Sequence, residues 1–233
     1  MLLRGVRPDA SSIRLFDGPV MLRFGDVSDI AAWIALREAS KAHLSRWEPT
    51  WSKADIAPAA VRRRMRRQEQ SIRAGRAAPF FVFERPARDA AARHDDYQPK
   101  PPRLVGGVTL SDIKRDVVQS AQIGYWIGAA YLHQGFGAAA VAAAARYGIE
   151  ALSLNRIEAA CQPENIASRR LLERLGFRQE GLARDYLHIN GAWRDHCLYA
   201  VTARDVETGA ALAGAVDDQK SDPCAPAFNH DAD

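Results

Sequence analysis

The chain has 233 residues, of which 47% are hydrophobic and 26% are charged, and its formal net charge is +4 at pH 7. This length fits one ordinary domain with attached ends, and the composition is that of a folded globular protein rather than a disordered one. No apolar run approaches the roughly 20 residues of a membrane span, and the apolar stretch at the N-terminus is too short for a secretory signal. We therefore expect a cytoplasmic protein without membrane contact.

The N-terminal part predicts one strand and one helix after a lead-in. Residues 1–19 form the lead-in, in which Ile13 to Phe16 could form a short strand, and the apolar run Val20 to Phe24 predicts a strand. Asp26 is a suitable start for the following helix, because Asp29 stands three positions later and apolar residues then recur at helical spacing.

A second helix is predicted from Ala57 to about Ala74, with Val61 and Met65 on its apolar face. It contains the run Arg62 to Arg67, in which all residues but Met65 are arginine. On a helix we expect these arginines to spread around most of the circumference as a solvated face. A weak contact with RNA or a ribosomal particle is the alternative.

Three strands are predicted in the middle of the chain, at Pro79 to Glu84, Leu104 to Ser111 and Ala121 to Ile127. Residues 85–102 between the first two are rich in proline and charge and show no periodicity, which predicts a flexible hairpin insertion. The third strand is expected at the centre of the sheet, and a helix from Ala138 to about Ala151 follows it.

The C-terminal half predicts three more strands and one helix. They are the strand Arg156 to Gln162, the helix Asn165 to Leu175, and the strands Phe177 to Ile189 and Trp193 to Ala203. The Asn190-Gly191 pair predicts a hairpin turn. Residues 205–233 lose periodicity and, after a short helical stub, are predicted to be disordered, so the folded domain is expected to cover residues 20–204.

Neither cysteines nor histidines predict a metal site. Cys161, Cys197 and Cys224 are odd in number and have no C-x-x-C spacing, which argues against a disulfide framework and against zinc. The first two stand in apolar strand-like runs, where we expect buried, inert thiols. The six histidines show no metal-ligand spacing, and His133 is expected to be a turn residue.

The segment between the central strand and the next helix predicts a phosphate site. From Leu132 to Ala138 it is L-H-Q-G-F-G-A, with Gly135 and Gly137 just before the expected helix. Backbone N–H groups at a helix start have no internal partner and lie at the positive end of the helix dipole. Glycines there let a phosphate approach the main chain, so the turn can hold a pyrophosphate without a basic side chain.

Two common phosphate motifs are excluded. The turn lacks the Lys-Ser/Thr pair of a nucleotide-triphosphate loop, and it lacks the three-glycine pattern of dinucleotide folds. Gly-x-Gly alone is weak evidence, since an ordinary strand-to-helix turn explains it equally well.

Three blocks between about Val20 and Thr202 resemble the GNAT superfamily of N-acetyltransferases. They are H-L-S-R-W-E-P-T-W at His43 to Trp51, the glycine turn with its helix, and G-F-R-Q-E-G-L-A-R-D-Y-L-H-I-N-G-A-W-R-D-H-C-L at Gly176 to Leu198. Within the superfamily they are most similar to ribosomal-protein alanine N-acetyltransferases of the RimJ type. The resemblance implies a mixed α/β fold, with a mostly antiparallel twisted sheet, splayed central strands and about four flanking helices.

The resemblance also implies that acetyl-CoA is the cosubstrate and that the turn holds its pyrophosphate. The turn residues concerned are Leu132, Gln134, Gly135, Phe136, Gly137 and Ala138. Main-chain N–H groups of Tyr125, Trp126 and Ile127, on a splayed central strand, would bond the pantetheine arm and the developing oxyanion. Asn165 would lie beside the same arm, although asparagine at this position also caps helices.

The chain departs from the family at two coenzyme positions. Leu132 stands where the turn usually begins with Gln or Arg, a change that binding by backbone amides should tolerate. Leu172 stands where many relatives carry a tyrosine general acid. Ser168, one helical turn after Asn165, is then the best candidate to protonate the departing thiolate, directly or through water.

Candidate acceptor residues come from the W-E-P segment and the last hairpin. Glu48 is the first, as a base acting through water or as an anchor for the incoming ammonium, with an ordinary salt bridge as the alternative. Trp47 and Trp51 either wall the acceptor pocket or fill the core. Asp185 and Tyr186 come second, because the resembled fold places their strand beside the substrate groove.

The central strand carries no Glu or Asp that could act as a strong base. This favours a protein α-amine, with pKa near 8, over lysine, with pKa near 10.4, because more of it is neutral at pH 7. We therefore expect transfer of acetyl from acetyl-CoA to a protein N-terminus, with a ribosomal protein as the expected partner. A small-molecule amine acetyltransferase acting on an aminoglycoside or polyamine, and a non-catalytic CoA-binding, ribosome-associated factor, are the alternatives. The oligomeric state is left open.

Overall fold

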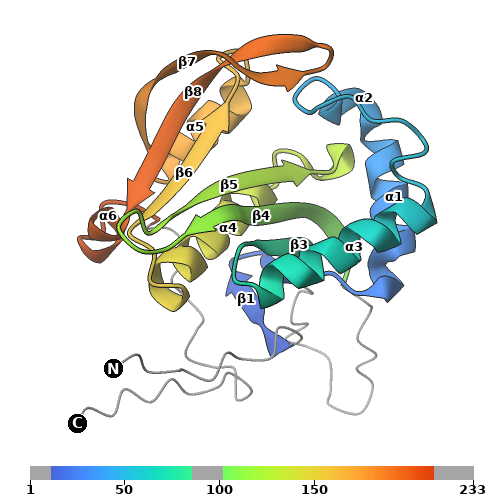
Figure 1. The fold of residues 1–233 in the computed structure, drawn as a ribbon, viewed down its shortest axis with the longest axis horizontal. Helices are drawn as coiled ribbons and strands as arrows, with labels where there is room; N and C mark the ends of the chain where they lie inside the picture. Colours follow the sequence, from blue (N-terminus) through green and yellow to red (C-terminus); the bar gives the residue numbers. More distant parts are fainter. Residues whose placement is uncertain (1–11, 86–101, 213–233) are drawn as a thin grey trace.

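The computed structural model describes residues 12–85 and 102–212, which form one eight-stranded sheet with helices on both faces (Figure 1). The strands are β1 (Arg14–Asp17), β2 (Val20–Phe24), β3 (Ala78–Glu84), β4 (Leu104–Lys114), β5 (Ser120–Ile127), β6 (Arg156–Cys161), β7 (Arg178–Ile189) and β8 (Ala192–Thr202). Their order in the sheet is β1-β2-β3-β4-β5-β6-β8-β7. Neighbouring strands are antiparallel, except that β5 and β6 run parallel.

The helices cover the two faces unequally. In the described residues they are α1 (Ile30–Ala39), α2 (Lys41–Leu44), α3 (Pro58–Arg73), α4 (Phe136–Arg146), α5 (Ile166–Arg174) and α6 (Ala203–Glu207). One face of the sheet carries α1 and α3, and the other carries α4 and α5 (Figure 1). The mixed, mostly antiparallel sheet confirms the expected fold class, and the expected four helices correspond to the four longer ones.

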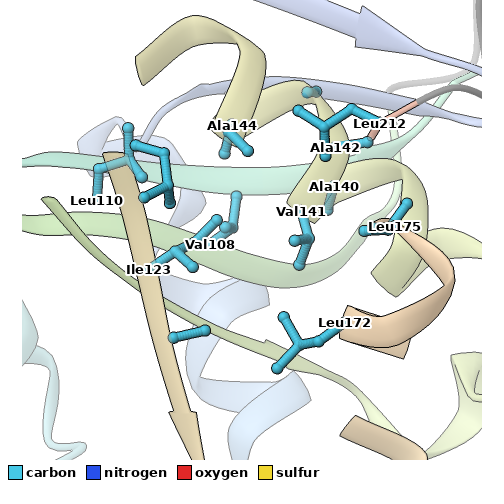
Figure 2. Packing of buried hydrophobic residues seen from close by; sticks show 14 of the residues in the cluster. Val108, Leu110, Ile123, Ala140, Val141, Ala142, Ala144, Leu172, Leu175 and Leu212 are labelled. Atoms are coloured by element: carbon cyan, nitrogen blue, oxygen red, sulfur yellow. The ribbon is translucent and has the colours of Figure 1, made fainter. Parts of the chain in front are cut away.

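The main core lies between the sheet and α4. This helix reads F-G-A-A-A-V-A-A-A-A-R and is almost wholly buried. Its alanines let the helix axis come close to the sheet, so that Val141 packs against Val108 and Ile123 of β4 and β5 (Figure 2). Leu172 of α5 and Leu175, the residue that caps the end of this helix, close the same core from the side (Figure 2).

Two helix starts differ from the sequence prediction in detail. Asp26 and Asp29 form the predicted capping box, but around a short 3-10 turn, Val27–Asp29, that precedes α1. The helix predicted from Ala138 begins at Phe136, because Gly135 adopts a left-handed φ of +82° and turns the chain into the helix in a single residue. Beyond Arg146 the helix continues as a wider π-type turn, Tyr147–Ala151.

The expected flexible segments lie mostly outside the described residues, which exclude 1–11, 86–101 and 213–233. Inside the described part, the lead-in contributes β1, which pairs with β2. After α6, Ala211 and Leu212 are buried in the main core. Within residues 12–85 and 102–212, no helix has the length and apolarity to cross a bilayer, and no group of three or more His, Cys, Asp or Glu side chains is placed to hold a metal ion.

Candidate active site

The central strand β5 separates from β6 soon after it begins. Its register with β6 covers only Ser120 to Gln122, whereas its register with β4 runs on to Ile127. From Ile123 onward the edge of β5 that faces β6 therefore has no strand partner, and main-chain groups on that edge are available to a ligand. Tyr125, Trp126 and Ile127 all lie in this splayed stretch.

The glycine turn forms the start of α4, just beyond the end of β5. Gly135 is the N-cap residue, and its φ of +82° lies in the region that glycine adopts without strain. Within the described residues, no side chain caps this helix start, and a Cβ built on Gly135 would meet no atom within 4 Å. Uncapped N–H groups beside open space, at the positive end of a helix dipole, fit a pyrophosphate.

The side chains of the other turn residues stabilise the turn itself. Phe136 is only 4% exposed and packs edge-on against Tyr131. The Gln134 amide donates to the Ala130 carbonyl at 3.1 Å. Leu132 and Ala138 pack against the main core. Any contact of these residues with a coenzyme would therefore come mainly from their main chain.

Gly137 has a packing role that the sequence did not reveal. A Cβ at this position would lie 3.2 Å from Leu171 Cδ1 and 3.5 Å from Ile127 Cγ1. The absence of a side chain therefore lets the first turn of α4 pack closely against α5 and the end of β5.

A hydroxyl pair spans the gap between β5 and α5. Asn165 caps α5 by accepting the Ser168 N–H at 3.1 Å, which confirms its capping role. The same turn brings Ser168 Oγ to 2.6 Å from the phenol oxygen of Tyr125. Burial raises the pKa of Tyr125 well above its ordinary value, and the hydrogen bond with Ser168 only partly opposes this. At neutral pH the phenol is therefore protonated.

Cys161 lies beside this pair at the end of β6. Burial raises the pKa of its thiol to about 11, with Cys197 acting in the same direction and a hydrogen bond with Ser168 in the opposite one. Both cysteines are buried and unpaired, as expected for inert thiols. Leu172, at the position of the family's tyrosine acid, is only 1% exposed and points into the core (Figure 2). Its side chain contributes packing at this position.

The W-E-P segment follows α2 and is held by a buried arginine of α1. Arg37 donates to both carboxylate oxygens of Glu48, at 2.8 and 2.5 Å. Its guanidinium carbon also lies 5.5, 5.1 and 4.9 Å from the ring centroids of Trp33, Trp51 and Trp126. The salt bridge that the sequence left as an alternative for Glu48 is thus present, inside a cage of three tryptophans.

The W-E-P segment contacts the β7–β8 hairpin and the residue after β6, across the gap that opens between β5 and β6. The Asn190 N–H donates to the Glu48 carbonyl at 3.3 Å, and the Gln162 side-chain amide donates to the Arg46 carbonyl at 3.5 Å. Trp47 is half-buried, with the Arg46 guanidinium 5.2 Å from its ring centroid. The W-E-P segment and the β7–β8 hairpin therefore lie together at the splayed end of the sheet (Figure 1).

Asp185 and Tyr186 lie where β7 loses its register with β8, between Ala183 and Leu187. Asp185 is exposed, has a φ of +45°, and donates its N–H to the Asp195 carboxylate at 2.9 Å. Tyr186 is 41% exposed. Both belong to the hairpin that contacts the W-E-P segment, but within the described residues neither forms a hydrogen bond or ion pair with Glu48 or Ser168.

Sequence reasoning missed Arg37 and the phenol of Tyr125. Nothing in the local pattern around Arg37 marks it as buried, although three of the chain's five tryptophans surround it. Tyr125 was assigned only a main-chain role, since its distance from Ser168 depends on how far β5 and β6 diverge.

Replacing Arg37 with methionine should destabilise the fold by about 2 kcal/mol, because Glu48 would remain half-buried without its partner. This is below the roughly 3–5 kcal/mol typical of fully buried pairs, since the Glu48 side chain is 23% exposed. Urea denaturation measures the change. Arg103→Gln, which breaks the exposed Arg103–Glu84 pair, is the matched control and should cost less than about 1 kcal/mol. Equal losses in the two variants would contradict a structural role for the Arg37–Glu48 pair.

Comparison with known proteins agrees with this geometry. A family model described as an acetyltransferase (GNAT) domain matches residues 20–178. The [ribosomal protein uS5]-alanine N-acetyltransferase of Escherichia coli (strain K12) is 31% identical over 207 residues, which are 88% of this chain and 98% of that protein. "Probable N-acetyltransferase YjcK" of Bacillus subtilis (strain 168) is 42% identical over 105 residues, which span 45% of this chain and 58% of that protein.

A solved structure, Mycobacterium smegmatis RimJ in complex with CoA-disulfide, superposes with a TM-score of 0.71 at 34% identity. The superposition covers 83% of this chain and 88% of that one. The family model alone spans more than half of the chain and includes both the splayed strand and the glycine turn. The chain therefore belongs to the GNAT family of acetyltransferases.

Proposed function

We propose that this protein transfers the acetyl group of acetyl-CoA to the N-terminal α-amine of a protein, with an alanine-initiated ribosomal protein as the substrate. The observation that carries the proposal is the Ser168 hydroxyl, which lies at the opening between β5 and β6 and bonds Tyr125. The near full-length similarity to an E. coli enzyme named for alanine N-acetylation of uS5 supports the choice of acceptor. A ribosomal-protein substrate would put this reaction in the cytoplasm.

Acetyl-CoA supplies an activated acetyl thioester, and two parts of the chain are suited to hold it. The uncapped start of α4 at Gly135 to Ala138 would bind the pyrophosphate through main-chain N–H groups. The free edge of β5 at Tyr125 to Ile127 would bond the pantetheine arm and polarise the thioester carbonyl. Asn165 and Ser168 would face the arm from α5, whereas Leu132 and Leu172 contribute packing.

Ser168 acts in this proposal as the general acid. Tyr125 keeps its proton because burial raises its pKa, so its O–H can donate to Ser168 Oγ. The serine hydrogen is then free for the sulfur that leaves when the C–S bond breaks and the C–N bond forms. The sulfur gains the proton of Ser168, the attacking nitrogen releases one proton to solvent water, and solvent water returns a proton to Ser168, so the protons balance.

The acceptor would enter beside the W-E-P segment. Glu48 can still accept a hydrogen bond from an incoming ammonium, because a carboxylate that binds one arginine retains free lone pairs. Two buried donors nearby, Arg37 Nε and Trp51 Nε1, have no hydrogen-bond partner within the described chain. Both atoms are enclosed by the surrounding side chains, so an acceptor would not reach them without a rearrangement of this segment. Trp47, Asp185 and Tyr186 would line the same approach.

The direct test uses an alanine-initiated peptide that also contains one lysine. With acetyl-CoA and enzyme, mass spectrometry should place a single acetyl group on the α-amine. The control is the same peptide with a blocked N-terminus, which should remain unmodified, since the lysine amine is almost fully protonated at pH 7. Acetylation of the blocked peptide, or of spermidine alone, would refute the proposed acceptor.

A further inference from the structure

Four of the arginines of α3 lie on one side of the helix. At 3.6 residues per turn, Arg62, Arg63, Arg66 and Arg67 fall within about 140° of the circumference, and all four are exposed. The fifth arginine of the run, Arg64, lies to the side of this group, with its guanidinium 5.7 Å from the ring centroid of Trp33. Arg64 is exposed as well, so the five arginines together span about 200° of the helix, and we refer to Arg62, Arg63, Arg66 and Arg67 as the α3 arginine face.

Glu69 lies beside this face, three residues after Arg66 on the same helix, but it is paired with Arg73. Within the described residues, no ion pair involves any of the four arginines of the face, and Glu69 is the one acidic residue of α3. Arg62 with Arg66, and Arg63 with Arg67, are like charges at i,i+4 spacing, which weakens a helix in isolation. An anionic partner would relieve this repulsion.

The surroundings of the face indicate which kind of anion fits. No large hydrophobic side chain of α3 is exposed, so the apolar centre of a typical protein interface is missing. The apolar side of the helix is already used, since Val61 is buried and Met65 packs in the cluster beneath α3, which leaves nothing to insert into a bilayer. Guanidinium groups match phosphate oxygens in geometry and charge, and four of them along two turns suit a repeated phosphate backbone.

We propose that the α3 arginine face binds the phosphate backbone of RNA. Helix α3 lies near the acceptor side of the site, because its Arg64 stacks over Trp33, which in turn contacts Trp126 on the splayed strand. RNA bound here would hold a ribonucleoprotein particle next to the acceptor entrance. The choice of RNA over DNA rests on the proposed function, whereas the phosphate chemistry rests on the helix alone.

The test measures binding of a fluorescent ribosomal-RNA hairpin to the full chain by anisotropy at a series of salt concentrations. Each phosphate contact adds roughly 0.7–0.9 to the slope of log K against log[salt]. The variant R62Q/R63Q/R66Q/R67Q should therefore lose about 3 units of slope. The matched control, R170Q/R174Q/R184Q/R204Q, makes the same charge change at exposed arginines elsewhere and should keep most of the slope. Equal losses in the two variants, or no loss in the first, would overturn the proposal.

Two further measurements distinguish RNA from other anionic partners, and this inference from the proposed function. Polyglutamate and anionic lipid vesicles at matched charge should compete poorly with RNA. If either competed as well as RNA itself, the partner of this face would be an acidic protein or a membrane and not RNA. Acetylation of the short alanine-initiated peptide should be the same in the α3 variant and the wild type. A chain that binds RNA through this face but acetylates no peptide would refute the proposed function and leave this inference standing.

Discussion

Replacing Ser168 with alanine should lower kcat for peptide acetylation by about 10²- to 10³-fold while changing the KM for acetyl-CoA less than about threefold. The large effect is expected because a positioned general acid contributes roughly 10²- to 10⁴-fold, and in the described chain no other hydroxyl forms a hydrogen bond with Tyr125. The small effect on KM is expected because the coenzyme would be held mainly by main-chain groups at Gly135 to Ala138 and on β5. Steady-state kinetics with the alanine-initiated peptide gives both values.

The variant Tyr125→Phe tests whether Ser168 acts as a general acid that the Tyr125 phenol orients, or only packs. If the phenol only orients Ser168, its removal should lower kcat by about 10-fold in the wild type and by almost nothing in the Ser168→Ala background. Because burial raises the pKa of Tyr125, its ionisation should not lower wild-type kcat between about pH 7 and 9. Unaltered kcat in Ser168→Ala, or additive losses in the double variant, would remove the hydroxyl pair from the mechanism.

The fold could be predicted largely from local patterns. Alternating apolar runs located the strands that were predicted, and Asn190-Gly191 located the β7–β8 hairpin, because these signals depend on neighbouring residues. The start of α4 was placed two residues late because a left-handed glycine can begin a helix directly, and a sequence does not report φ. The helix predicted around Arg62 to Arg67 was correct. The contact of Arg64 with the Trp33 ring could not be predicted, because Trp33 belongs to a different helix, α1.

The candidate site could be predicted in part. The glycine turn and the cap at Asn165 are local features, and both lie where expected. The Tyr125–Ser168 contact joins residues 43 positions apart, and the Arg37–Glu48 pair depends on how α1 packs beneath the W-E-P segment. Such contacts follow from the tertiary arrangement of elements, so composition and spacing alone could not indicate them.

Replacing Gly135 with valine should weaken acetyl-CoA binding about 100-fold. Valine disfavours the φ of +82° that this residue adopts, and its branched side chain would occupy the open space in front of the first turn of α4. An anion bound at that helix start would lose both its room and its charge-assisted hydrogen bonds to the main chain, each worth about 1.5–3 kcal/mol. Isothermal titration calorimetry with acetyl-CoA measures the loss.

Gly209→Val is the matched control for this variant. Gly209 also has a positive φ, +70°, and open space around its Cβ position, but it follows α6, outside the candidate active site. Both substitutions should cost about 1–2 kcal/mol of stability through backbone strain, so thermal unfolding should shift similarly in the two proteins. Only Gly135→Val should also lose coenzyme affinity. If the two variants bound acetyl-CoA equally well, the start of α4 would not be the pyrophosphate site, and the coenzyme would have to be held by the splayed edge of β5 alone.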